Sequence, residues 1–261
     1  NSGSQATGIS ANALSSSFSY QGVGGFPGDD GDCTAVLAGN SSCLVVIVYT
    51  PTVLGSESDI ITVNYVDGVG PQTTSVNLRG TAVNTAQIDI SEVDTYDFGN
   101  IALNGIIHHT FTLTNSGGFQ ALGITELSLG ADFRFLGGSF PGDNGDCTAS
   151  LGASNTCNIV VEFNPQSLGL INGNIQIDYN NGTAVDSSVR LISGTGVNPA
   201  DLTILGASPV NFGAVPVGGS VDLTLTVSNT GNFDSSAMGG TGLTLPFQFA
   251  GGSYPGTGGT C

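Results

Sequence analysis

The sequence Phe-Pro-Gly-Asp-Asn-Gly-Asp-Cys at residues 140–147 repeats Phe-Pro-Gly-Asp-Asp-Gly-Asp-Cys at residues 26–33, 114 positions earlier. The same offset relates further pairs along the chain: Cys157 and Cys43, 194–198 and 80–84, Phe212 and Phe98, Asn229 and Asn115, Cys261 and Cys147. Self-similarity at a fixed period is typical of tandem arrays in which each repeat is one folding unit. The sequence therefore predicts repeats of 114 residues.

The repeat boundaries follow the endings Gly-Thr-Ala-Val-Asn and Gly-Thr-Gly-Val-Asn. They define a complete repeat at 85–198, the later part of a repeat at 1–84 and the earlier part of another at 199–261. Because a half sandwich exposes its core and its edge strands, we expect this sequence to be an excerpt of a longer array. The alternative is a subunit whose half-domains are completed by neighbouring chains. In that case the two partial repeats would overlap, because each contains a counterpart of residues 115–147.

Within a repeat, residues of two kinds alternate. In residues 107–114, for example, the more apolar set Ile107, His109, Phe111 and Leu113 alternates with a histidine and threonines. Period-two alternation is typical of half-buried strands. The expected strands cover residues 86–90, 107–114, 123–129, 133–136, 158–163, 174–179, 187–192 and 221–227. Seven or so short strands in about a hundred residues predict an all-β fold of tandem immunoglobulin-like β-sandwich repeats.

Charge and hydropathy exclude several partners. The 261 residues include 3 Lys and Arg against 20 Asp and Glu, for a formal net charge of −17. Binding to phosphates needs clustered cations, so we expect no nucleic-acid partner. Apolar runs such as residues 44–49 are much shorter than the roughly 20 residues that span a bilayer, so we expect no membrane insertion in this segment.

Several motifs recur in a fixed order in each repeat. They are Phe-Gly near the start, Thr-Asn-Ser-Gly at 114–117 or Ser-Asn-Thr-Gly at 228–231, Cys-x-Ile-x-Val-x-Phe-x-Pro at 157–165, and Gly-Thr-Gly at 194–196. In this order they resemble the choice-of-anchor D repeats, which belong to the Hydin-like, major-sperm-protein-like (ASH) group of immunoglobulin-like domains. The resemblance implies an exported bacterial surface or extracellular protein with many such modules, and it supplies no catalytic residues.

The cysteines are spaced for local disulfides. Cys33 and Cys43, like Cys147 and Cys157, lie ten positions apart, and we predict one disulfide inside each repeat. The alternatives are reduced core cysteines or a two-cysteine metal site. Cys261 would have its partner ten residues further along the array. Disulfides persist in oxidising compartments, which predicts an extracellular or cell-surface location.

The turn before the first cysteine of each pair is acidic. Its carboxylate and amide side chains are Asp29, Asp30, Asp32, Asp143, Asn144 and Asp146. Oxygen-rich clusters suit calcium, which is the one cofactor we consider. The alternative is a solvated turn, because Asp and Gly are common turn formers and the third copy reads Thr-Gly-Gly-Thr at 257–260.

The sequence offers no recurring catalytic group. His108 and His109 are the only histidines, and neighbouring strand residues point to opposite faces. We expect His109 to be buried or half-buried in the core, His108 to be exposed, and the protein not to be an enzyme. Phe26, Phe140 and Tyr254 precede the Pro-Gly turn in each repeat and are candidates for a ligand contact or a contact at a module junction; the alternative is packing against their own sandwich.

These observations favour a structural segment of a long extracellular tandem-repeat protein that forms a surface stalk or filament. Its expected partners are neighbouring repeats of the same chain and identical chains in a filament. The alternative is an adhesin module that binds a carbohydrate or a protein on another cell or surface.

Overall fold

The computed structural model describes residues 4–15, 17–127 and 129–261. Its internal contacts divide the chain into two compact units, one of residues 1–85 with 117–119 and one of residues 86–116 with 120–261. We describe three stretches in turn: the N-terminal segment (4–84), the central segment (85–198) and the C-terminal segment (199–261). The described residues include no helix that is long and apolar enough to cross a membrane.

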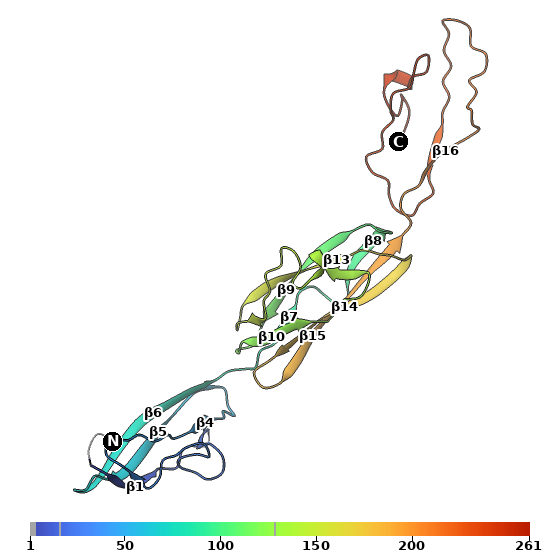
Figure 1. Ribbon diagram of the computed structural model, residues 1–261. Coiled ribbons are helices and arrows are strands. Elements are labelled where there is room, and N and C mark those ends of the chain that lie inside the picture. Colours follow the sequence, from blue (N-terminus) through green and yellow to red (C-terminus); the bar gives the residue numbers. More distant parts are fainter. Residues whose placement is uncertain (1–3, 16, 128) are drawn as a thin grey trace. The chain divides into compact units, whose positions relative to one another are not determined.

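The central segment is a two-sheet β-sandwich (Figure 1). Its strands are β7 (Ile88–Ile90), β8 (Tyr96–Ala102), β9 (Ile107–Asn115), β10 (Ala121–Glu126), β11 (Phe133–Phe135), β12 (Ser150–Leu151), β13 (Thr156–Phe163), β14 (Gly169–Asn180) and β15 (Val185–Val197). One sheet has the order β12-β10-β14-β15-β8 and the other has the order β11-β13-β9-β7. The all-β, immunoglobulin-like fold is therefore confirmed.

The core of this sandwich follows from alternation along the strands. In β9 the side chains of Phe111 and Leu113 are fully buried, and Thr112 between them is not. In β14 the buried residues are Ile175, Ile177 and Tyr179, again every second position. Each strand thus gives one apolar face to the space between the sheets, where burial of apolar surface stabilises the fold.

Strand β8 is the one central strand, apart from the two-residue β12, that the sequence pattern did not indicate. It pairs parallel with β15 at the edge of its sheet, with a register shift between Ser193 and Thr195. Gly99 within β8 has a φ of 79°, which interrupts the strand pattern. The strand is therefore held by its neighbour's hydrogen bonds rather than by an alternating sequence of its own.

The N-terminal segment forms two smaller sheets. Its strands are β1 (Ala6–Ala11), β2 (Phe18–Tyr20), β3 (Val36–Leu37), β4 (Ile47–Tyr49), β5 (Gly55–Val66) and β6 (Pro71–Ala82). The strand orders are β3-β1-β5-β6 and β2-β4. These are the orders of β12-β10-β14-β15 and β11-β13 in the central segment, so the counterparts of β7, β8 and β9 are not among the described strands of this segment.

The C-terminal segment contains the strands β16 (Leu202–Leu205) and β17 (Thr226–Asn229). They pair antiparallel with Leu202 opposite Asn229, just as β7 pairs β9 with Ile88 opposite Asn115. The strand expected over residues 221–227 is observed only from Thr226, because residues 221–225 have no paired strand in the described part of the segment. Single-turn 3-10 helices, η1 (Leu136–Gly138) and η2 (Ala250–Gly252), lie before the Pro-Gly turns.

Candidate functional site

Each disulfide closes a short loop between cysteines ten positions apart. Cys147 bonds Cys157 and Cys33 bonds Cys43, and in both cases the Cα atoms are 4.9 Å apart. Cys157 lies on β13, one residue after its start, and both Cys147 and Cys157 are buried. The predicted pairing is confirmed, and the third position, Cys261, is an exposed free thiol. Disulfides of this kind persist in oxidising surroundings.

The acidic turn of the central segment is built on hydrogen bonds to the backbone. A carboxylate oxygen of Asp146 accepts the Asn158 N–H at 2.6 Å, which joins the turn to β13. The Asp143 carboxylate lies over Gly137, where a Cβ atom would come within 2.6 Å of it. Gly137 has a φ of 79°, a backbone conformation that favours glycine. The carboxylates of Asp143 and Asp146 thus both lie against the backbone of the folded turn.

The N-terminal acidic turn repeats these contacts. Asp32 accepts the Leu44 N–H at 2.5 Å, and the Asp29 carboxylate lies over Gly22. Among the described residues, the single group of three potential metal ligands within 4.8 Å of one another is Asp32 with Cys33 and Cys43. The two sulfur atoms of that group are joined in the disulfide, so it offers one carboxylate rather than a calcium cage. Calcium binding at the two turns, by the six residues Asp29, Asp30, Asp32, Asp143, Asn144 and Asp146, stays a prediction.

The aromatic residue before each Pro-Gly turn packs against an aromatic of its own segment. Phe140 meets Phe135 edge to face with ring centroids 5.5 Å apart, and Phe26 meets Tyr20 in the same way at 5.7 Å. In the C-terminal segment, Tyr254 and Phe249 are 5.6 Å apart. Phe26, Phe140 and Tyr254 are half-buried residues.

The two histidines lie on opposite sides of β9. His109 is half-buried, stacks on Tyr96 at 4.1 Å and contacts the Glu92 carboxylate through Nε2 at 3.2 Å. His108 is exposed. Burial, together with the charges of Glu92 and Asp97, raises the pKa of the Tyr96 phenol. His109 therefore occupies the core position expected from the sequence, and its neighbours are an aromatic ring and a surface carboxylate.

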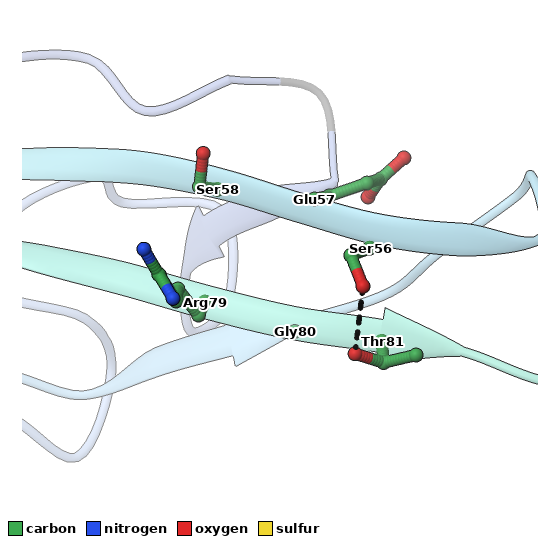
Figure 2. A pocket seen from close by; sticks show the side chains of 6 residues that line it. All are labelled: Ser56, Glu57, Ser58, Arg79, Gly80 and Thr81. Carbon is green, nitrogen blue, oxygen red and sulfur yellow. Dashed lines mark hydrogen bonds between the residues drawn. The ribbon is translucent and has the colours of Figure 1, made fainter.

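A pocket of 290 Å³ lies on the β5–β6 hairpin of the N-terminal segment. Figure 2 shows its six lining residues on the two strands. They are Ser56, Glu57, Ser58, Arg79, Gly80 and Thr81. The Ser56 and Thr81 hydroxyls are 3.2 Å apart and hydrogen bonded. The pocket therefore lies across both strands of the hairpin. The stretch of β15 that corresponds to its β6 residues pairs with β8 in the central segment.

Sequence reasoning did not identify the role of Asn115, which is fully buried. Its side-chain oxygen accepts the Gln87 N–H at 3.1 Å, and its amide donates to the Leu151 carbonyl at 3.0 Å. Asn115 thereby links β9 to the residue just before β7 and to β12 of the other sheet. The sequence does show that asparagine recurs at position 229, but the hydrogen bonds that this residue makes are visible only in the structure.

A scan against known protein families finds no match to this chain. A search of curated proteins also finds none. Solved structures that are similar to it include the VesB protease of Vibrio cholerae, with 21% identity, a TM-score of 0.34, and coverage of 43% of this chain and 32% of that one. The chain thus matches about a third of the length of that protease.

Two further similar structures are smaller. A protein of unknown function from Porphyromonas gingivalis W83 has 13% identity and a TM-score of 0.32, with coverage of 74% of this chain and 85% of that one. The ASH/PapD-like domain 7 of human CEP192 has 11% identity and a TM-score of 0.31, with coverage of 44% and 88%. Likeness at this level carries no argument about activity, and the functional conclusion rests on the chain's own residues.

Proposed function

We propose that this chain is a structural segment of a long extracellular tandem-repeat protein that forms a stalk or filament at a cell surface. The observation that carries the proposal is that both partial segments repeat elements of the central sandwich at an offset of about 114 residues. The N-terminal sheets repeat the strand orders β12-β10-β14-β15 and β11-β13, and the pair β16-β17 repeats the pair β7-β9. In an array of such units each repeat contacts its neighbours, so adding repeats adds length. The disulfide in each of the first two segments fixes a loop locally, as suits a protein outside the cell.

The charge supports the same role. A net charge of −17 with three cationic side chains favours solubility and mutual repulsion between neighbouring fibres, and it opposes binding to nucleic acid. We also propose that the segment is not an enzyme, since His109 is engaged with Tyr96 and Glu92 and has no counterpart in the other segments.

The experiment is immunogold labelling of intact source cells with an antibody against the central segment. Labelling of projections from the outer surface, abolished by brief protease treatment of whole cells, is the expected result. Gold particles that appear only after the cells are permeabilised would refute the surface role. Two measurements on the same material test the array: the mass of the native polypeptide under denaturing conditions, and its tryptic peptides. We expect further tryptic peptides that match the repeat.

Adhesion is the second candidate, and the half-exposed Phe140 ring is the observation that favours it. A broad glycan array probed with the full chain tests it directly. Binding that is lost in Phe140→Ala and kept in Val189→Ala, an exposed apolar residue of the central segment, would support a ligand site. No binding on the array would refute carbohydrate adhesion through this ring.

A further inference from the structure

The turn between β14 and β15 carries a short motif with a chemistry of its own. Residues 181–183 read Asn-Gly-Thr, which fits the acceptor pattern Asn-x-Ser/Thr of N-linked glycosylation. Acceptor sites of this kind lie in surface loops, and here Gly182 and Thr183 are exposed and Asn181 is half-buried. The pattern is short and also occurs at residues 40–42, so the pattern alone does not identify a modified site.

The side-chain oxygen of Asn181 holds this turn together. It accepts the Thr183 N–H at 3.0 Å and the Ala184 N–H at 3.0 Å. The backbone closes the same turn, because the Asn181 N–H donates to the Ala184 carbonyl at 2.9 Å. Gly182 has a φ of 102°, a backbone conformation that favours glycine. The turn thus uses an oxygen acceptor on its first side chain and a glycine at the next position.

The corresponding turn between β5 and β6 shows that an aspartate makes the same backbone contacts. Asp67 is the counterpart of Asn181, 114 positions earlier. Its Oδ1 atom accepts the Val69 N–H at 2.9 Å and the Gly70 N–H at 3.0 Å. Gly68, between them, has a φ of 95°, close to that of its counterpart. Because a carboxylate makes both backbone bonds, these bonds do not require the amide nitrogen of Asn181.

The Thr183 hydroxyl is a second group that the turn does not need. It donates to the Asn181 side-chain oxygen at 2.9 Å, beside the two backbone N–H groups. The counterpart of Thr183 is Val69, which has no hydroxyl, and the N-terminal turn keeps its backbone bonds without one. The side-chain amide at the first position and the hydroxyl at the third therefore occur together in the central turn. They are the two groups that the acceptor pattern specifies.

The amide nitrogen of Asn181 faces a carboxylate. Its Nδ2 atom donates to Oδ2 of Asp186, on β15, over a long contact of 3.4 Å. The N-terminal turn keeps an amide and a carboxylate at these positions but exchanges them, since Gln72 hydrogen bonds the Asp67 carboxylate. The central turn thus places the amide at the acceptor position. The three hydrogen bonds to the Asn181 oxygen polarise that amide, which makes its N–H protons more acidic.

We propose that Asn181 is a site of N-linked glycosylation. The co-reactant is a sugar activated as a phosphate ester, which a glycosyltransferase brings to the turn. The Asn181 Nδ2 atom forms a bond to the anomeric carbon of the sugar, and the bond from that carbon to the phosphate oxygen breaks with its electron pair on the leaving phosphate. The displaced amide proton passes to a carboxylate, and that of Asp186 lies 3.4 Å from the nitrogen. This inference goes beyond the stalk or filament role and does not depend on it.

The first test is mass spectrometry of the protein isolated from its source. Trypsin cuts after Arg134 and Arg190, and the peptide 135–190 contains Asn181 as its one match to the acceptor pattern. After reduction of the disulfide, we expect this peptide to exceed its sequence mass by the mass of one or more sugar residues, with fragmentation placing the increment on Asn181. The peptide 80–134 contains no match and is the internal control, which should have its sequence mass. A peptide 135–190 at its sequence mass, or an increment on Thr183, would overturn the proposal.

The second test uses variants of the protein expressed in the source cells. Asn181→Asp introduces the residue of the N-terminal turn, so the peptide 135–190 should lose the sugar entirely while the far-ultraviolet circular dichroism spectrum stays unchanged. Thr183→Val removes the hydroxyl and should also lose the sugar, whereas Thr183→Ser, the matched control, should keep it. A sugar that persists on this peptide in Asn181→Asp, or that is lost equally in Thr183→Ser and Thr183→Val, would refute the assignment.

Discussion

The side-chain amide of Asn115 donates a hydrogen bond to the Leu151 carbonyl at 3.0 Å in a position with no solvent exposure. Asn115→Ala leaves this carbonyl and the Gln87 N–H without that partner, and an unpaired buried polar group costs about 1–3 kcal/mol. We expect the unfolding free energy of the central segment to fall by that amount, measured by urea denaturation. Asn229→Ala is the control, because the same residue is exposed there, and an equal loss in both variants would contradict the account.

Removal of the Cys147–Cys157 disulfide should destabilise the central sandwich without changing its fold. The chain-entropy model assigns a loop of this size about 2–3 kcal/mol. A double Cys→Ser variant at these positions should therefore have a lower calorimetric melting temperature and an unchanged far-ultraviolet circular dichroism spectrum. Cys261→Ser removes a thiol that is exposed and unpaired, and should leave the melting temperature where it was. A double variant that melts with the unmodified chain would show that the bond contributes little.

Most of the fold that the sequence could predict followed from local patterns that recur at the repeat offset. Cysteine spacing located the disulfides, and side-chain alternation located the strands of the central sandwich other than β8 and β12, because both are local properties. The sequence did not indicate β8, whose hydrogen bonds come from β15, more than ninety residues further along the chain. It also predicted a strand at residues 221–227 that pairs only from Thr226, since a strand needs a partner as well as a pattern. The backbone contacts of Asp143 and Asp146 depend on turns whose geometry no spacing reveals.

Gly194 allows the two sheets of the central segment to approach each other. A Cβ atom at this position would lie 2.4 Å from Cε1 of Phe163, which is fully buried. Gly194→Ala should therefore force the ring or the strand to move, at a cost of about 1–3 kcal/mol. Gly182→Ala is unsuitable as a control because its φ is 102°, whereas Ser187→Ala replaces an exposed residue of the same strand. Thermal unfolding should separate Gly194→Ala from Ser187→Ala, and identical melting curves would rule out the close contact.

The Asp59 carboxylate makes the stability of the N-terminal segment depend on pH. It accepts the Ser15 N–H at 2.6 Å and the Ile60 N–H at 2.8 Å, and these bonds lower its pKa. Because the folded-state pKa lies below the unfolded value of about 3.9, the contribution is fully present above that pH and is lost as pH falls through the folded-state pKa. Asp59→Asn should therefore lower the unfolding free energy of the N-terminal segment at pH 7, and it should lower it less in acid. Ser58→Ala, at the exposed neighbouring residue, should have the same effect at both pH values.

The role of the acidic turn can be separated from calcium binding with one variant. Asp146 accepts the Asn158 N–H, and this hydrogen bond joins the turn to β13. Asp146→Ala should lower the unfolding free energy of the central segment by about 1 kcal/mol, the usual net value of one hydrogen bond. We expect the same loss in calcium and in excess chelator, measured as paired thermal unfolding curves. If calcium raises the melting temperature of the unmodified chain and Asp146→Ala abolishes that rise, the carboxylates of this turn hold the ion, and the backbone contact is the smaller part of their role.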